Sequence, residues 1–278
     1  MGFYRLSLLI LVLFVTLHNE AKSRLKLATT TSTYDSGLLD VLLPPFHDKV
    51  AGTIIVDVIA VGTGKALKLA ENGDVDVVLV HAPKLETAFV SAGFGTKRRS
   101  IMYNDFVIAR SPEDQAEILG MKSATNAFSA ISAKRAQWFS RGDLSGTHLK
   151  EIEIWKTSGI TPEGTWYVEV GQGMAATLRM ADEKKGYVLI DRGTYLALKE
   201  TVNLEILVEG DTLLHNLYSI IAVNPKRWPH TKTREAQKLI DFLTSNQGQA
   251  LISRYQKSGQ RLFTPLGNTN TPSIGVEK

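Results

Sequence analysis

The sequence contains no cysteine, and this absence removes several kinds of chemistry from consideration. Without a thiol the chain forms no disulfide bond, and it has no thiolate to act as a nucleophile or to bind a metal. It also has no N-terminal cysteine that could carry a lipid anchor. Disulfides therefore contribute nothing to the stability of this fold.

Histidine is scarce, and basic residues are not concentrated. The six histidines stand apart without His-x-x-x-His spacing, which disfavours a metal-dependent hydrolase. The net charge of +4 is small, and lysine and arginine are scattered except at residues 97–99. A nucleic-acid-binding protein usually carries a concentrated basic stripe, so we expect no nucleic-acid partner.

Long hydrophobic runs are lacking apart from one near the N-terminus. The apolar run Leu6–Leu17 follows Arg5 and covers about a dozen residues, whereas a membrane span needs about twenty. We therefore predict a secretory signal peptide over residues 1–23, with an uncleaved N-terminal anchor as the alternative. A protein exported in this way, without a lipid anchor, is expected in the periplasm.

The composition is that of a globular protein. With 44% hydrophobic and 22% charged residues, the chain can build one large domain or two modest lobes. Thr53–Ala60 and Val75–Val80 are rich in β-branched residues and alternate with helical patterns. This alternation predicts an α/β fold with a mostly parallel sheet, whose carboxyl edge collects the loops that bind ligands.

Two strand-like segments, Arg99–Ala109 and Leu217–Val223, suit a chain that crosses twice between two lobes. We predict two hinge crossings and two lobes, each a mostly parallel sheet flanked by helices. The first lobe is discontinuous and comprises residues 24–106 and 216–265, and the second lobe, residues 107–215, is inserted between them. Residues 266–278 are rich in Asn, Thr, Gly and Pro and are expected to form a flexible tail.

Four consecutive hydroxyl residues, Thr30–Thr33, follow the first predicted strand. The helix that comes next is predicted from Leu38, Leu42 and Phe46, and Pro44-Pro45 is expected to close it. Unpaired amides at a helix start, together with hydroxyl donors, can hold a small anion. A single Ser or Thr there usually only caps the helix, but four exceed what one helix start can use. We interpret this segment as the first wall of an anion site.

A second loop of this kind is Val61–Lys65, in which two glycines flank Thr63. Backbone amides can approach an anion closely there, and a simple tight turn is an equal alternative. The spacing of a phosphate loop or a dinucleotide fingerprint is absent, so nucleotide binding is disfavoured. A further glycine-led helix start, Gly171–Glu183, is interpreted mainly as core.

The third loop, Ser140–His148, precedes a predicted helix. Ser145, Gly146 and Thr147 stand where the free amides of that helix would be. Arg141 lies upstream and can add a guanidinium that pairs with oxyanions through two hydrogen bonds and keeps its charge. A capping turn with a surface arginine is the alternative.

Seven motifs stand in order along the chain from about Leu25 to Pro265. They are LATTTSTYDSGLLDVLL (27–43), VGTGKAL (61–67), GDVDVVLVH (73–81), MYNDFVI (102–108), SRGDLSGTH (140–148), GQGM (171–174) and DRGTYLA (191–197). In order and spacing they resemble the periplasmic tungstate-binding component of a tungstate ABC importer. The resemblance implies a two-lobed type II periplasmic binding-protein fold that holds a tetrahedral oxyanion between its lobes.

The resemblance also implies the ligand-binding residues. They are Thr30, Thr31 and Ser32 in the first loop, Thr63 in the second, and Arg141, Ser145, Gly146 and Thr147 in the third. It implies a monomer that delivers tungstate, with molybdate as a second ligand, to an ABC permease, without catalysis, cofactor or bound metal ion. Two departures are Leu144, where an acidic residue is common, and Leu217-Tyr218-Ser219, which bears on the geometry of the hinge.

The protonation of the ligand sets what its site must offer. Tungstate and molybdate are fully deprotonated dianions near neutral pH, so they need donors only, whereas phosphate keeps protons and rewards a carboxylate. Asp35 and Asp143 are expected to orient neighbouring donors instead of facing the anion. A binder of phosphate, sulfate or molybdate on the same fold is one alternative. An exported phosphatase or sulfatase is another, for which His148 is the one suggestive residue, although we expect it simply to begin a helix.

Overall fold

The computed structural model describes residues 22–266 of the chain. The predicted signal peptide, residues 1–23, lies outside the described residues except for its last two. The predicted flexible tail, residues 266–278, lies outside them except for Leu266. Every described helix is too short or too polar to cross a bilayer.

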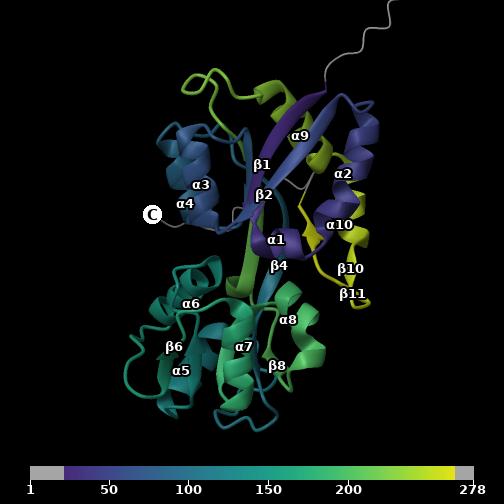
Figure 1. The fold of residues 1–278 in the computed structure, drawn as a ribbon. Helices are drawn as coiled ribbons and strands as arrows, with labels where there is room; N and C mark the ends of the chain where they lie inside the picture. Colours follow the sequence, from purple (N-terminus) through teal and green to yellow (C-terminus); the bar gives the residue numbers. More distant parts are fainter. Residues whose placement is uncertain (1–21, 267–278) are drawn as a thin grey trace, which may run out of the picture.

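We call lobe 1 the part of the molecule drawn in the upper half of Figure 1. Its strands are β1 (Ser23–Thr30), β2 (Ile54–Val61), β3 (Val77–Val80), β9 (His215–Ala222), the first part of β4 (Arg99–Arg110), and the short β10 (Gln256–Lys257), β11 (Gln260–Arg261) and β12 (Thr264–Pro265). Its helices are α1 (Thr31–Asp35), α2 (Leu38–Lys49), α3 (Thr63–Asn72), α4 (Pro83–Ser91), α9 (Thr233–Thr244) and α10 (Asn246–Arg254).

We call lobe 2 the part drawn in the lower half of Figure 1. Its strands are β5 (Trp138–Ser140), β6 (Tyr167–Glu169), β7 (Tyr187–Asp191), β8 (Glu205–Val208) and the second part of β4. Its helices are α5 (Ala124–Ala133), α6 (Gly146–Thr157), α7 (Met174–Glu183) and α8 (Arg192–Leu198), with the 3-10 turns η1 (Lys199–Thr201) and η2 (Thr212–Leu214).

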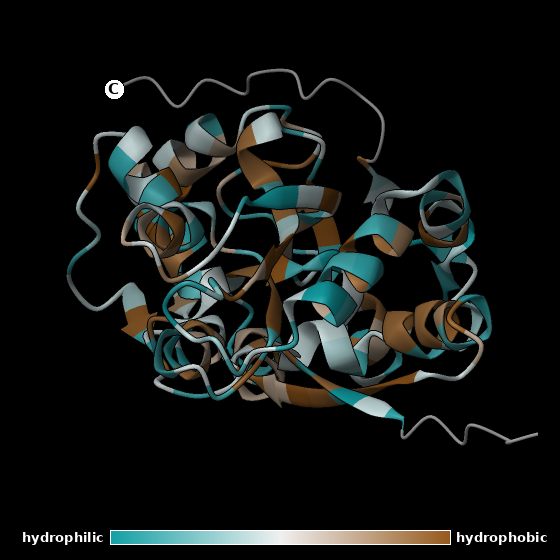
Figure 2. Cartoon of the chain, turned by 90° about the horizontal axis from the view of Figure 1, so that it is seen from above, coloured by the Kyte–Doolittle hydropathy of each residue, from teal (hydrophilic) through white to brown (hydrophobic). Residues whose placement is uncertain are grey.

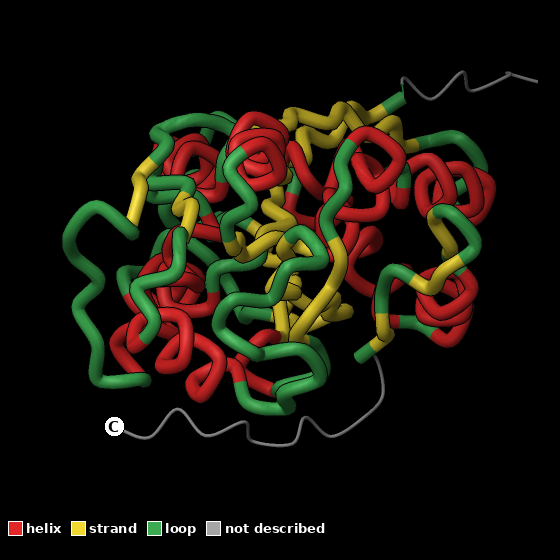
Figure 3. Tube along the Cα trace, turned by 90° about the horizontal axis from the view of Figure 1, so that it is seen from below, coloured by secondary structure: helices red, strands yellow, loops and turns green. Residues whose placement is uncertain are grey.

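The two lobes share one sheet. Within residues 22–266 it has ten strands in the order β2-β1-β3-β9-β4-β7-β5-β6, with β8 and β12 pairing to β4. β1 is parallel to β2 and β3, and β5 is parallel to β6 and β7, whereas β4 and β9 run antiparallel to their neighbours. The predicted α/β fold is therefore confirmed, with a sheet that is mixed because of these two strands. Seen along the long axis, strands occupy the middle and helices the sides (Figure 3).

β4 carries the chain from one lobe to the other. Its residues Arg99–Asp105 pair with β9 in lobe 1, and its residues Phe106–Ala109 pair with β7 in lobe 2. β9 begins at His215, opposite Asp105, and brings the chain back into lobe 1. The molecule thus has the two crossings of the type II fold, and they lie side by side.

Two details of the first loop differ from expectation. The hydroxyl run forms its own short helix, α1, and Gly37, in the left-handed conformation at φ 83°, separates it from α2. The prediction that Pro44-Pro45 closes the next helix is wrong, because α2 continues through both prolines to Lys49. Phe46 is fully buried and its ring lies 5.7 Å from that of Phe242, so tertiary packing outweighs the backbone hydrogen bonds lost at the prolines.

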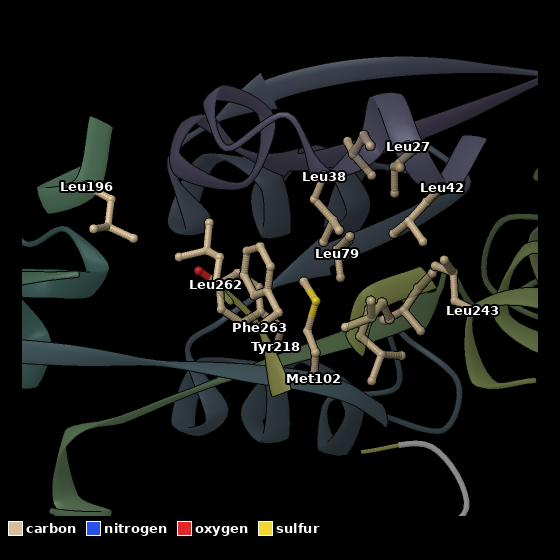
Figure 4. Packing of buried hydrophobic residues seen from close by; sticks show 14 of the residues in the cluster. Leu27, Leu38, Leu42, Leu79, Met102, Leu196, Tyr218, Leu243, Leu262 and Phe263 are labelled. Atoms are coloured by element: carbon tan, nitrogen blue, oxygen red, sulfur yellow. The ribbon is translucent and has the colours of Figure 1, made fainter. Parts of the chain in front are cut away.

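Both faces of the sheet are covered in each lobe. One buried cluster lies under α3 and α4 of lobe 1, and another under α5 and α6 of lobe 2. The largest cluster runs through both lobes, and Figure 4 shows part of it, with Leu262 and Phe263 lying between Leu196 and Leu38. Figure 2 shows the hydrophobic residues concentrated on the central strands. Each lobe is therefore firmly packed, and the loops between its strands and helices rest on a stable base.

Candidate functional site

A cavity of about 600 Å³ lies where loops of lobe 1 face loops of lobe 2. All eight residues predicted from the sequence line it: Thr30, Thr31, Ser32, Thr63, Arg141, Ser145, Gly146 and Thr147. Three sequence segments more than thirty residues apart thus meet at one place. The contact of each residue with an anion stays a prediction, but their convergence on one cavity is a property of the fold.

The first wall is the end of β1 and the start of α1. Thr30 is buried, and its Oγ1 accepts the Thr33 N–H at 3.2 Å and lies 2.6 Å from Thr33 Oγ1 and 3.1 Å from Ser32 Oγ. Its hydroxyl therefore caps α1. The capping alternative, in which Ser32 or Thr33 caps the next helix, is wrong, because Gly37 stands at the N-cap of α2. Thr31 and Ser32 are more exposed and lie on the lining of the cavity.

The second wall is the start of α3. Gly62 stands at the N-cap without a side-chain hydrogen bond, and Thr63, which is buried, begins the helix. The first amides of α3 have no partner within the helix and are available to a ligand. Both Gly62 and Thr63 line the cavity, so the second loop contributes amides as well as a hydroxyl.

The third wall begins with Arg141, directly after β5. Its Nη2 donates to Asp143 Oδ2, while its Nε is buried and has no hydrogen-bond partner in the part of the chain that the structure describes. A buried donor without a partner is unfavourable, so Nε is a candidate donor to a ligand in the cavity that Arg141 lines. Burial alone would raise the pKa of Asp143, but hydrogen bonds from Ser145 and the charge of Arg141 hold it below its usual value. The carboxylate thus stays ionised and orients the guanidinium.

The rest of this loop is held in a tight conformation. Gly142 (φ 62°) and Leu144 (φ 55°) both adopt the left-handed region. The amide of Leu144 donates to His148 Nδ1 at 2.9 Å, and the amide of Ser145 donates to Asp143 Oδ1 at 3.1 Å. His148 does more than begin a helix, because its ring fixes the loop that carries Arg141.

The start of α6 completes the third wall. Ser145 is its N-cap, and its Oγ accepts the His148 N–H at 3.4 Å. The amides of Gly146 and Thr147 have no partner inside the helix. Since α6 runs over twelve residues, its N-terminal end also presents a partial positive charge to an anion.

Sequence reasoning missed a fourth wall, at the start of α7. Gly173 is an N-cap without a side-chain hydrogen bond, and it lines the cavity together with Met174, Ala175 and Ala176. Arg179, one turn further along, is an exposed cation on the same lining. The interpretation of Gly171–Glu183 mainly as core holds for Met174, Leu178 and Ala181, which are buried, but it left out that the helix start also lines the cavity. The signal was present, because the glycine-led start repeats the pattern of the second loop.

His81 was also missed. It follows β3 directly and lines the cavity, with its Nε2 at 3.4 Å from Ser32 Oγ and its Nδ1 at 2.8 Å from Asn216 Oδ1. Its ring stacks on that of Tyr218, with the centroids 4.8 Å apart. The available signal was its position, because a polar residue at the carboxyl end of a buried strand lies at the ligand-binding edge.

Two carboxylates are present on the lining. Asp191, at the end of β7, accepts the amide of Thr194 at 2.9 Å and its hydroxyl at 2.6 Å, so it caps α8. Asp35 also lines the cavity, and its carbonyl oxygen, not its carboxylate, accepts Lys257 Nζ at 2.9 Å. The expected orienting role is thus seen for Asp143, while Asp35 makes no such bond with its side chain among residues 22–266.

Metal binding has no support in the part of the chain that the structure describes. No group of three or more His, Asp or Glu residues there is arranged to hold a metal ion. A smaller cavity of about 280 Å³ lies on lobe 2, lined by residues such as Ile152, Trp155 and Ile160. It contains none of the predicted site residues, so the cleft between the lobes is the candidate site.

The chain is similar to known binding proteins over most of its length. Residues 18–247 match the family described as PBP superfamily domain. The chain is 45% identical over 250 residues to the tungstate-binding protein TupA of Peptoclostridium acidaminophilum, which covers 88% of this chain and 87% of that protein.

Solved structures give the same result. The tungstate-binding protein TupA of Desulfovibrio alaskensis G20 is 46% identical, with a TM-score of 0.81 over 88% of this chain and 99% of that one. The tungstate ABC transporter structure from Geobacter sulfurreducens is 55% identical, with a TM-score of 0.76 over 84% of this chain and 98% of that one. These two structures therefore resemble this chain in both sequence and fold, over most of both lobes.

Proposed function

Because this chain belongs to the PBP superfamily and, within it, to the family of TupA tungstate-binding proteins, we propose that it captures tungstate between its lobes. Molybdate, which has the same shape and charge, is the expected second ligand. The protein then delivers the anion to the permease of an ABC importer. It acts as a monomeric carrier in the periplasm, without catalysis and without a cofactor or resident metal ion.

One observation carries the proposal for the site. Donors from both lobes line a single cavity, and one of the lining residues, Arg141, has an Nε that is buried and has no hydrogen-bond partner among residues 22–266. The starts of α3, α6 and α7 add amides with no partner inside their helices. Such an array suits an anion that has only acceptors to offer, as tungstate does.

The number of donors is sufficient for tight binding. Each charge-assisted hydrogen bond contributes about 1.5–3 kcal/mol, and nanomolar affinity corresponds to about 12 kcal/mol. Six or so such bonds, less the free-energy cost of association, reach that range. Donors from a single lobe would not surround the anion, so binding should draw the two lobes together like a hinge.

The direct test is calorimetric titration of the purified protein with tungstate, molybdate, sulfate and phosphate. We expect tungstate and molybdate to bind with nanomolar Kd values, and sulfate and phosphate to bind at least a hundredfold more weakly. Tighter binding of phosphate or sulfate would contradict the proposal. Turnover of aryl phosphates or aryl sulfates by the protein would show that it is an enzyme instead.

The position of Asp35 favours one alternative, a binder of protonated phosphate, since a carboxylate can accept the phosphate proton. The variant Asp35→Asn separates the two cases. If tungstate is the ligand, removing a negative charge from the lining should strengthen its binding by a few fold. If phosphate is the ligand, the loss of the acceptor should weaken phosphate binding instead. Parallel titrations of the wild type and the variant with both anions decide between them.

Export can be tested separately. We expect the full-length chain to be found in the periplasmic fraction of a bacterial host, and a chain that lacks residues 1–23 to stay in the cytoplasm. A full-length protein that remains in the membrane fraction would favour the uncleaved anchor. Neither outcome bears on the binding site, because every residue that lines the cavity comes after residue 23 in the sequence.

A further inference from the structure

His81 lies where the two lobes touch. On one side its Nε2 is 3.4 Å from Ser32 Oγ of lobe 1. On the other side it faces the start of α6 in lobe 2, where a methyl group added to Gly146 would lie 3.0 Å from His81 Cε1. The imidazole therefore adjoins both the first and the third wall of the cavity.

The hydrogen bonds of Asn216 determine which ring nitrogen of His81 carries the proton. Asn216 is buried, and its Nδ2 donates to Tyr218 Oη at 3.1 Å. In the structure its Oδ1 faces His81 Nδ1 at 2.8 Å, and since an amide oxygen only accepts, this arrangement requires a hydrogen on Nδ1. In the neutral ring, Nε2 then has a lone pair directed at Ser32.

This arrangement does not suit a dianion. With Nε2 as an acceptor, the Ser32 hydroxyl can donate its hydrogen to His81, and it then presents only lone pairs to the cavity and to Thr30 Oγ1, which lies 3.1 Å away. An anion that has only acceptors would then meet two further acceptors at this wall. Adding a proton to Nε2 reverses the direction, because Nε2–H would donate to Ser32 Oγ and the Ser32 hydroxyl would be free to donate to the anion.

The charges on the lining also favour the addition of a proton when a dianion binds. Three cations, Arg141, Arg179 and Lys257, stand against two carboxylates, Asp35 and Asp191, which leaves one positive charge for a doubly negative guest. Asp143, which pairs with Arg141 from outside the lining, reduces it further. One additional proton would bring the site closer to neutrality in the complex.

We propose that His81 takes up one proton from solution when the dianion binds, and that His81 thereby orients Ser32 as a donor to the anion. The inference rests on the proposed function, since it assumes a doubly charged oxyanion in the cavity. His81 acts through Ser32 and is thus a positioning residue. No bond other than that between Nε2 and the added proton is formed or broken.

The surroundings of His81 favour its neutral form. Burial lowers the pKa of His81, and the Asn216 hydrogen bond and the nearby charge of Asp191 offset this only in part. A dianion next to Ser32 would raise that pKa. Binding therefore takes up a proton at pH values between the free and the bound pKa, and affinity rises as pH falls through that window.

The test begins with the wild-type protein. Titrating it with tungstate near pH 7.5 in several buffers of different ionisation enthalpy gives the number of protons exchanged. We expect an uptake that approaches one proton per anion, and a Kd that falls by up to about tenfold for each unit of decreasing pH between 8.5 and 6.5. Tungstate binding with no proton uptake and no pH dependence would overturn this inference and leave the proposed function intact. An absence of tungstate binding would overturn both.

Two variants assign the proton. His81→Gln keeps a polar side chain but cannot titrate, so its proton uptake should vanish and its Kd should become independent of pH. The matched control is His230→Gln, because His230 hydrogen-bonds Gly73 O at 2.9 Å and does not line the cavity. The control should keep the wild-type proton uptake. If uptake persists in a folded His81→Gln variant, as judged by its circular dichroism, His81 is not the group.

Discussion

The guanidinium of Arg141 is held in place by its neighbours. Asp143 holds Nη2 and stays ionised, while Nε is buried and has no partner among residues 22–266. Arg179 lines the same cavity but is exposed, and it makes no hydrogen bond or ion pair within residues 22–266. The two arginines therefore share a charge but differ in pre-organisation, which determines how much each contributes to binding.

We expect Arg141→Ala to weaken tungstate binding by at least about a hundredfold, because it removes charge-assisted hydrogen bonds worth about 1.5–3 kcal/mol each. Arg179→Ala removes the same charge from the rim and should weaken binding only a few fold. Calorimetry of both variants measures the difference. Unchanged affinity in Arg141→Ala would remove this residue from the site.

The loop between β5 and α6 owes its shape to its backbone. Gly142 (φ 62°) lies against β6, where an added methyl group would be 2.8 Å from Glu169 Cβ and 3.3 Å from Glu169 Cα. Gly171 (φ 68°) lies just beyond β6 and donates its amide to Arg141 O at 2.9 Å, but it has open space around its α-carbon. These two glycines allow backbone strain to be separated from steric displacement of the loop.

Gly142→Ala should both destabilise the protein and weaken tungstate binding, because the methyl group must push the loop and Arg141 away from β6. Gly171→Ala carries the same left-handed strain of about 1–2 kcal/mol but meets no neighbour, so its affinity should stay near that of the wild type. Thermal unfolding and tungstate titration of both variants test this. Equal losses of affinity would show that the contact with β6 does not position the loop.

The two lobes are joined by more than the crossing strands. The largest buried cluster includes residues of both lobes, among them Leu196 and Leu262. Across the front of the cleft, Lys84 on α4 lies 3.0 Å from Glu153 on α6, with 85% and 31% of their side chains exposed. This ion pair joins the lobes directly, so it stabilises the arrangement in which the lobes touch.

Since surface ion pairs contribute about 0–1 kcal/mol, Lys84→Ala should weaken tungstate binding by at most about fivefold relative to wild type. At high salt the Kd of Lys84→Ala for tungstate should approach that of the wild type, because screening removes the contribution of an exposed ion pair. Lys68→Ala is the matched control, as it breaks the 3.1 Å pair with Glu71 within α3. Titrations at low and high ionic strength provide the measurement. A difference that is independent of salt would argue against an electrostatic link between the lobes.

The loops that line the cavity were predictable because their signals are local. Each hydroxyl- or glycine-rich turn stands directly between a strand and a helix in the sequence, and parallel strands end at a common edge of the sheet. This argument holds within one lobe, where Thr30 and Thr63 follow the parallel strands β1 and β2, whereas the assignment of Arg141 to the same cavity came from the resemblance to the tungstate-binding family. The two crossings could be predicted as well, since Arg99–Ala109 and Leu217–Val223 are strand-like segments separated by a whole lobe.

Other features depend on contacts between distant residues, which a linear pattern does not contain. His81 acquires its role from Asn216, which is 135 residues away and reaches it only because β3 pairs with β9. The continuation of α2 through Pro44 follows from the burial of Phe46 against Phe242. Local propensity is weak compared with the free energy of packing, so long-range contacts decide the role of His81 and the length of α2. The order of strands, turns and helices along the sequence already specifies the α/β fold and the loops that line the cavity.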